Sequence, residues 1–144
     1  MEVVEFLLAH ENYAVESRYV QEISPLKELT ALPGTPPFIL GIINFRGHIL
    51  TVIDLRYFFN LPQKGLTGLN KVIIVQASET KIGILADTIH GIKSIPVNEL
   101  QPPLPAMTGI RGEYIKGLTG ERLAVLDLEK LLSDKRIIVH EEVD

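Results

Sequence analysis

The sequence has no cysteine among its 144 residues. It therefore has neither disulfides nor thiolate chemistry, which suits a reducing cytoplasm. Its apolar runs are only a few residues long, far short of the roughly 18 that a membrane-spanning helix requires. The first residues, MEVVEFLLAHEN, are acidic and lack the small-residue cleavage site of a signal peptide. Together these absences predict a cytoplasmic protein that does not insert into a membrane.

Positive charge is also in short supply. The chain has 14 Lys and Arg against 18 Asp and Glu, a net charge of −4 and a pI near 5.6. A nucleic-acid binder usually presents a basic face, and no Lys/Arg cluster occurs here. The balance of charge therefore argues against nucleic acid as a partner.

The motifs of the common catalytic and nucleotide-binding sites are missing as well. The sequence contains no GxxxxGK[ST], GxGxxG, GxSxG or HExxH. Its four histidines are widely spaced and form no ligand motif: His10, His48, His90 and His140. We therefore expect no enzymatic activity, no metal and no cofactor.

The residues that are abundant favour strands. The 17 Ile and 11 Val together outnumber the 20 Leu. We expect strands at 3–9 and 13–16 around a turn at 10–12, hairpins at 38–53 and 71–87, and strands at 113–118 and 122–127. We expect short helices at 17–23, with Ser17 as N-cap, and at 55–59 and 128–133. Loops are expected at 32–37, 61–68 and 101–109, and a loosely held tail at 136–144.

One pattern occurs twice. Residues 47–59 read GHILTVIDLRYFF and residues 120–132 read GERLAVLDLEKLL. Upstream, Asn44 aligns with Gly117, and these are the residue types that best tolerate positive φ. The repeat predicts a mainly β protein of two similar barrels, because a barrel hides its strand edges. We place the first lobe at about 13–65 and the second at about 70–133.

Two aspartates occupy equivalent positions in the repeat, Asp54 and Asp127. Two carboxylates can perform acid–base chemistry, so an enzyme is one interpretation. However, each aspartate follows a predicted strand and precedes a predicted helix, where a carboxylate caps the first turn. We favour the capping role. Gly47 and Gly120 are interpreted as hairpin-turn glycines.

Arg46 departs from the repeat, because its equivalent in the second copy is Thr119. A residue that the hairpin required would occur in both copies. Arg46 is therefore either a solvated turn residue or a recognition residue, since a guanidinium presents five donors in a rigid fork. Glu22 is the other charged residue that lies between apolar residues of the kind found in a core. The simpler interpretation is that it occupies a solvated position on a short helix.

Three segments resemble the CheW-like domain family: YAVESRYVQEI, LPGTPPFILGIINFRGHILTVIDLRYFF and YIKGLTGERLAVLDLEKLL. The resemblance extends from Phe6 to about Ser133 and includes the family's Glu-Ile after the second strand, its N-x-R-G run and its V-x-D-L. The sequence departs from the family at Phe45, where leucine is usual, and at residues 17–19.

This resemblance implies two pseudo-symmetric SH3-like five-stranded β-barrel subdomains without catalysis. It implies an adaptor between the regulatory domain of the histidine kinase CheA and the cytoplasmic tip of chemoreceptors, monomeric when isolated and recruited to membrane-associated arrays. It also implies partner-binding roles for Glu22, Asn44, Arg46 and Gly47. Family members fused to kinase or receiver domains are longer, so a standalone adaptor is expected. A small barrel that binds nucleic acid or another protein is the alternative.

Overall fold

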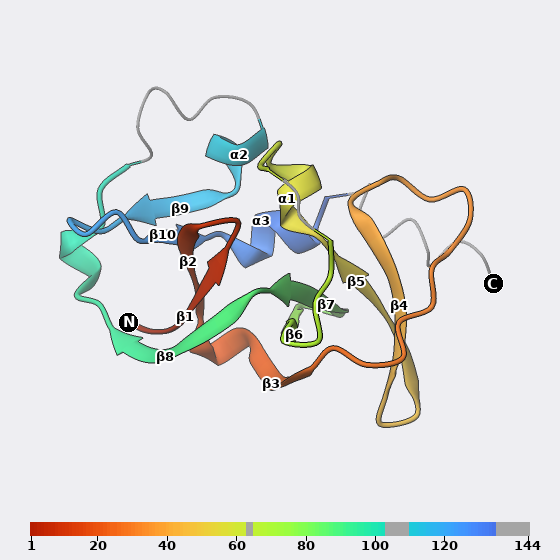
Figure 1. Cartoon of the computed structure of the whole chain (residues 1–144). Helices are drawn as coiled ribbons and strands as arrows, with labels where there is room; N and C mark the ends of the chain where they lie inside the picture. The colour runs from red at the N-terminus through yellow and green to blue at the C-terminus, as the bar shows by residue number, and fades with distance from the viewer. Residues whose placement is uncertain (63–64, 103–109, 135–144) are drawn as a thin grey trace.

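The computed structural model describes residues 1–62, 65–102 and 110–134, and its strands form two five-stranded sheets (Figure 1). Sheet A has the order β8-β1-β2-β10-β9, and sheet B has the order β3-β6-β7-β5-β4. The strands are β1 Glu2–Leu8, β2 Glu11–Glu16, β3 Val20–Pro25, β4 Ile39–Phe45, β5 His48–Ile53, β6 Lys71–Ala77, β7 Thr80–Ala86, β8 Thr88–Ser94, β9 Ile115–Leu118 and β10 Ala124–Leu126. The helices are α1 Leu55–Phe58, α2 Ile110–Glu113 and α3 Leu128–Leu132, with 3₁₀ turns η1 Ser17–Tyr19 and η2 Val97–Glu99.

Most of the predicted elements are confirmed, but the helix predicted at 17–23 is wrong. Only η1 is helical, and the chain continues as strand β3, which pairs with β6. Ser17 is not an N-cap; its hydroxyl donates to the carbonyl of Glu2 at 3.1 Å. Cross-strand pairing has overridden a weak helical spacing of two apolar residues. Strand β8 was not predicted, and the first turn consists of Ala9 and His10 rather than residues 10–12.

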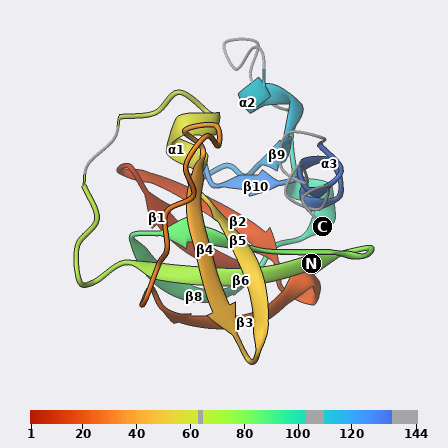
Figure 2. The same cartoon turned by 90° about the vertical axis from the view of Figure 1, so that its right-hand side faces the viewer.

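The two repeats lie in the two halves of the chain, and we use first repeat for the half with β1 to β5 and second repeat for the half with β6 to β10. The two halves exchange strands between the sheets. Sheet A combines β1 and β2 of the first repeat with β8, β9 and β10 of the second, and sheet B combines β6 and β7 with β3, β4 and β5 (Figure 2). The parallel pairs are equivalent in register, with Val52 opposite Gly83 in sheet B and Val125 opposite Ala14 in sheet A. Neither sheet is built from one half of the chain alone, and the two lobes placed at about 13–65 and about 70–133 stay a prediction.

Each sheet closes through a backbone bridge between its edge strands. In sheet B, Thr30 follows β3 and exchanges hydrogen bonds with Ile42 of β4 at 2.9 and 2.8 Å. In sheet A, Gln101 follows β8 and exchanges bonds with Leu118 of β9 at 2.9 and 2.8 Å. The bridges connect the otherwise open edges, in agreement with the predicted two five-stranded barrel subdomains.

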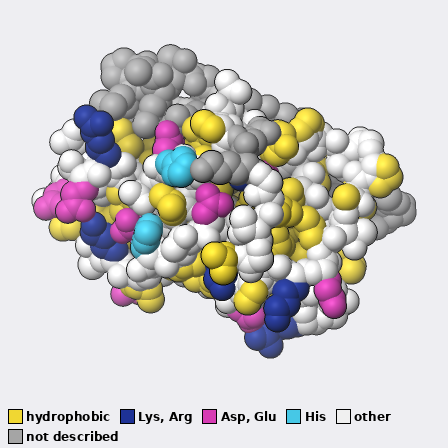
Figure 3. Space-filling model, in the orientation of Figure 1, with side chains coloured by type: hydrophobic (Ala, Val, Ile, Leu, Met, Phe, Trp, Pro, Cys, Tyr) yellow, Lys and Arg dark blue, Asp and Glu magenta, His cyan; other side chains and the backbone are white. Residues whose placement is uncertain are grey.

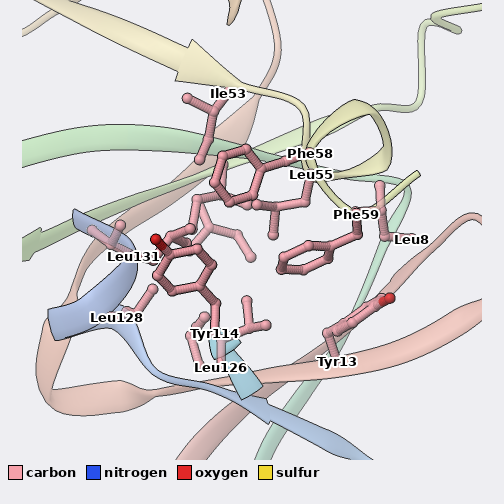
Figure 4. Close-up of a cluster of buried hydrophobic side chains, with 14 of the residues drawn as sticks. Leu8, Tyr13, Ile53, Leu55, Phe58, Phe59, Tyr114, Leu126, Leu128 and Leu131 are labelled. Atoms are coloured by element: carbon pink, nitrogen blue, oxygen red, sulfur yellow. The ribbon is translucent and has the colours of Figure 1, made fainter. Parts of the chain in front are cut away.

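The two barrels share one hydrophobic core (Figure 4). Its aromatic centre joins α1 to the second repeat, with the Phe58 and Tyr114 ring centroids 5.5 Å apart and the Phe38 and Phe58 centroids 5.2 Å apart. Each barrel also has a small cluster of its own: Val3, Ala14, Ile95, Leu123 and Val125 in sheet A, and Ile43, Leu50, Val52, Val72 and Ile74 in sheet B. Strands such as β1 and β6 thus bury both faces.

Asn44 and Gly117 are residue types that tolerate positive φ, but neither adopts it here. Gly117 is needed for space: a Cβ there would lie 3.0 Å from the carbonyl oxygen of Gln101. Gly41 plays the same part in sheet B, where a Cβ would lie 2.4 Å from the carbonyl oxygen of Thr30. The closing bridge of each barrel thus depends on a glycine.

Replacing Gly41 by alanine should weaken the closure of sheet B. A Cβ at this contact meets backbone, which cannot rotate away, so we expect a loss of about 1–3 kcal/mol in the free energy of unfolding. Gly68→Ala is the matched control, because no atom lies within 4 Å of its added Cβ. Urea denaturation measures both, and equal midpoints for the two variants would contradict the close-contact argument.

Candidate functional site

The β4–β5 turn combines three of the predicted partner-binding residues. Arg46 and Gly47 form a two-residue turn with φ values of 51° and 84°. Positive φ at both positions matches the twist of a hairpin. The side-chain oxygen of Asn44 accepts a hydrogen bond from the backbone N–H of Gly47 at 2.9 Å. Asn44 and Gly47 therefore shape a turn that presents Arg46 at its tip.

Glu22 lies against this tip, although it is 24 residues away in sequence. The Nε of Arg46 donates to Glu22 Oε1 at 3.1 Å, and its Nη2 donates to the same oxygen. The Arg46 side chain is 72% exposed and that of Glu22 is 33% exposed. Glu22 stands on strand β3, not on the helix that the sequence suggested. The pair joins the two edge strands of sheet B and remains open to solvent.

A groove of about 410 Å³ begins at this pair. Its lining mixes charged, polar and apolar side chains: Glu22, Ser24, Pro25, Lys27, Glu28, Ile43, Asn44, Phe45 and Arg46. Sequence reasoning did not assign a role to Phe45, whose ring centroid lies 5.4 Å from Arg46 Cζ and 6.0 Å from Lys81 Nζ. An aromatic ring with cations over its face, next to carboxylates, is a combination of groups that can bind a protein surface.

A second exposed ion pair occupies the equivalent place in sheet A, and sequence reasoning missed it. Lys93 of β8 donates to Glu121 in the β9–β10 turn at 2.7 Å. This hydrogen bond raises the pKa of the Lys93 ammonium group and lowers the pKa of the Glu121 carboxyl group, so both stay charged near neutral pH. Linear alignment cannot find the pair, because it places Thr119 opposite Arg46.

Both aspartates cap helices, as predicted. An oxygen of Asp54 accepts from the N–H of Arg56 at 3.0 Å, and an oxygen of Asp127 accepts from the N–H of Lys130 at 3.1 Å. Asp54 is also fully buried and binds the Arg56 side chain through both oxygens, with an Nη2–Oδ2 distance of 2.8 Å. This hydrogen bonding raises the pKa of Arg56. A carboxylate without solvent access and bound to arginine is unsuited to acid–base catalysis.

The described part of the chain contains no cluster of three or more His, Asp or Glu that could hold a metal ion. Of the four histidines, His140 lies outside that part, as do the tail at 136–144 and most of the loop predicted at 101–109. No helix within residues 1–62, 65–102 and 110–134 is long and apolar enough to cross a membrane.

Comparison with known proteins points to one family. The family model of the CheW-like domain matches residues 2–136. The chain is 32% identical to the chemotaxis protein CheW of Klebsiella aerogenes over 141 residues, which covers 96% of this chain and 85% of the relative. It is 31% identical to the CheW of Treponema pallidum over 143 residues, 94% of this chain and 84% of the relative. The crystal structure of the scaffolding protein TtCheW from Thermoanaerobacter tengcongensis superposes with a TM-score of 0.77 at 33% identity, over 87% of this chain and 81% of that one.

The two capping aspartates should differ in their contribution to stability. Asp127→Ala removes a cap, so we expect a loss of about 0.5–2 kcal/mol. Asp54→Ala also removes the carboxylate that pairs with the buried guanidinium of Arg56, so the loss of stability should exceed that of a cap alone. Asparagine should restore stability at position 127 but not at 54, since it caps without a charge. Chemical unfolding of the four variants measures this, and equal losses for the two alanine variants would count against the buried ion pair.

Proposed function

Because this chain belongs to the CheW-like domain family, we propose that it is a non-catalytic adaptor in a bacterial chemosensory array. It couples the cytoplasmic tip of chemoreceptors to the histidine kinase CheA, by way of the kinase's regulatory domain. It acts in the cytoplasm and joins receptor arrays at the membrane through its partners. The names of the relatives, two chemotaxis proteins and a scaffolding protein, support this assignment.

The pair formed by Glu22 on β3 and Arg46 on the β4–β5 turn carries the proposal. An exposed ion pair contributes only about 0–1 kcal/mol to folding. A non-glycine residue such as Arg46 in the left-handed region costs of the order of 1–3 kcal/mol. The fold therefore gains little or nothing from this arginine, and recognition accounts for it better.

The chemistry of the turn fits a protein partner. The guanidinium of Arg46 can donate to a carboxylate or to backbone carbonyls. The neighbouring groove adds an aromatic ring, lysine and carboxylates, which is the mixed composition of protein interfaces. A nucleic acid would meet Glu22 and Glu28 in the same groove, so the small nucleic-acid-binding barrel is the weaker alternative.

The adaptor should be required for receptor control of the kinase while having no activity of its own. Purified kinase, receptor fragments and this protein are combined, and ATP-dependent phosphorylation is measured with each component omitted in turn. We expect receptor-dependent kinase output only when the protein is present. Kinase output that is the same with and without it would refute the adaptor role.

Arg46→Ala should fold normally and weaken partner binding. The change in stability should stay within about 0.5 kcal/mol, because the side chain is exposed. Glu22→Ala should act in the same direction on binding. The matched control is Arg122→Ala, since Arg122 is also an exposed arginine in a hairpin turn, with a φ of 65°.

Circular dichroism melts measure the stability of each variant. A titration with the purified kinase domain and receptor fragments measures its binding. Binding that is unchanged in Arg46→Ala, or weakened equally in Arg122→Ala, would remove Arg46 from the partner-binding surface. A collapsed fold in Arg46→Ala would show that the arginine is structural.

A further inference from the structure

Two cations from different parts of the chain lie over one aromatic ring of sheet B. The ring belongs to Phe45, the last residue of β4, which is partly buried and packs against the small hydrophobic cluster of this barrel. Arg46 Cζ lies 5.4 Å from the ring centroid, and Lys81 Nζ of β7 lies 6.0 Å from it. A ring held by the barrel thus gives both cations one fixed neighbour. We call Phe45, Arg46 and Lys81 the Phe45 cluster.

Only one of the two cations has an acidic partner in the described part of the chain. Glu22 accepts from Arg46 through its single oxygen Oε1. No carboxylate within residues 1–62, 65–102 and 110–134 forms an ion pair with Lys81, although Glu79 is close to it in sequence. The cluster and Glu22 together therefore have an excess of positive charge, on a chain whose net charge is −4.

The second repeat shows that the fold does not require this cluster. It has Leu118, Thr119 and Asn12 at the positions of the three cluster residues. The aligned hairpins give the first two, and the equivalent parallel strand pairs, β5 with β7 and β10 with β2, give the third. None of the three is aromatic or charged, yet sheet A closes through the same kind of bridge. The ring and its two cations are therefore not needed to close a barrel.

We propose that the Phe45 cluster is the anchor for an acidic side chain, Asp or Glu, of a protein partner. A carboxylate has two oxygens, so one can accept from Arg46 and the other from Lys81. The guanidinium has five donors, and Glu22 engages only its Nε and Nη2. This inference rests on the proposed function, since it names the partner group that meets the same turn.

The location of the cluster leaves it open to such a partner. The Arg46 side chain is 72% exposed, and Lys81 is partly exposed. In Figure 3, Lys and Arg side chains gather at the lower right of the face shown, near the region where Figure 1 places the β4–β5 turn. Lys27 and Glu28 in the adjoining groove offset each other in charge, so Lys81 decides the sign of the site. The site therefore favours an anion.

Substitution of Lys81 in the whole chain tests the anchor. Lys81→Ala should bind its partner about tenfold more weakly, because a hydrogen bond between charged groups is lost. Lys81→Arg should bind like the wild type, since it keeps the charge. The matched control is Lys71→Ala, because Lys71 is also a partly exposed lysine on a strand without an ion pair to a described carboxylate. Calorimetric titrations with the kinase regulatory domain and with receptor fragments measure the affinities.

An exchange of charges identifies the partner group. Lys81→Glu should bind more weakly than Lys81→Ala, because two carboxylates then face each other. Surface Asp and Glu residues of the partner are replaced by Lys, one at a time. One of these replacements should restore binding to Lys81→Glu, a rescue that a purely structural role of Lys81 would not allow.

A peptide titration tests carboxylate recognition without kinase or receptor. The probe is acetyl-Glu-Glu-Glu-Glu-amide, and the control is the same peptide with glutamine in place of glutamate. The glutamate peptide should shift the NMR signals of the Phe45 ring and of Lys81 more than those of Arg122, an exposed arginine in the other hairpin turn. The glutamine peptide should shift none of them.

The outcomes separate this inference from the adaptor role. Binding of Lys81→Ala that equals the wild type for both partners, or equal losses in Lys81→Ala and Lys71→Ala, would overturn the anchor and leave the adaptor intact. A wild-type chain that binds neither partner would refute the adaptor instead, and the peptide titration then decides alone. Peptide shifts that are as large at Arg122 as at the Phe45 cluster would overturn the anchor in either case.

Discussion

The exchange of hairpins between the two repeats is the constraint on which the rest of the structure depends. Sheet A cannot form from the first repeat alone, because three of its strands belong to the second repeat. Sheet B cannot form from the second repeat alone, because three of its strands belong to the first. Strands β1 and β6 bury one face in the core of their own barrel and the other in the shared core. The apolar surface of each repeat is therefore covered only when the other repeat is folded, which favours a single cooperative unit.

Charged groups as well as apolar contacts position the connections between strands. Glu16 ends β2 just before η1 carries the chain to sheet B, and its side chain is only 9% exposed. It accepts from Arg18 and from Lys116, each at 3.2 Å. At the other end of the first repeat, Asp54 and Arg56 form a buried pair at the start of α1. The Glu16 pairs therefore position the chain where it leaves sheet A for sheet B, and the Asp54–Arg56 pair positions α1 between β5 and β6 of sheet B.

The paired strands hold the exposed ion pairs of the two turns in fixed positions, so these weak interactions can still be specific for a partner. The ion pairs at the two turns contribute little to the free energy of folding. Their positions are nevertheless set by strands that cannot shift, because a one-residue slip would move every buried side chain to the wrong face. A pair of exposed charges on such a frame loses little conformational freedom when a partner binds.

The sequence by itself determined the local features of this protein. Runs of β-branched residues predicted most of the strands, and the position of Asp54 and Asp127 after a strand predicted the two capped helices. Gly47 predicted the hairpin turn that presents Arg46. These features depend on residues close together in the chain, so their physical causes are visible in a linear reading.

Only the tertiary structure decided which strands share a sheet and which charges meet. The helix predicted at 17–23 gives way to strand β3 from Val20 onward because β6 pairs with it. Strand β8, with its alternating exposure, is held by β1 from the other repeat. Glu22 meets Arg46, and Lys93 meets Glu121, only because each barrel closes on itself. Contacts between residues distant in the chain depend on how apolar faces are covered across both repeats, and no local pattern records that arrangement.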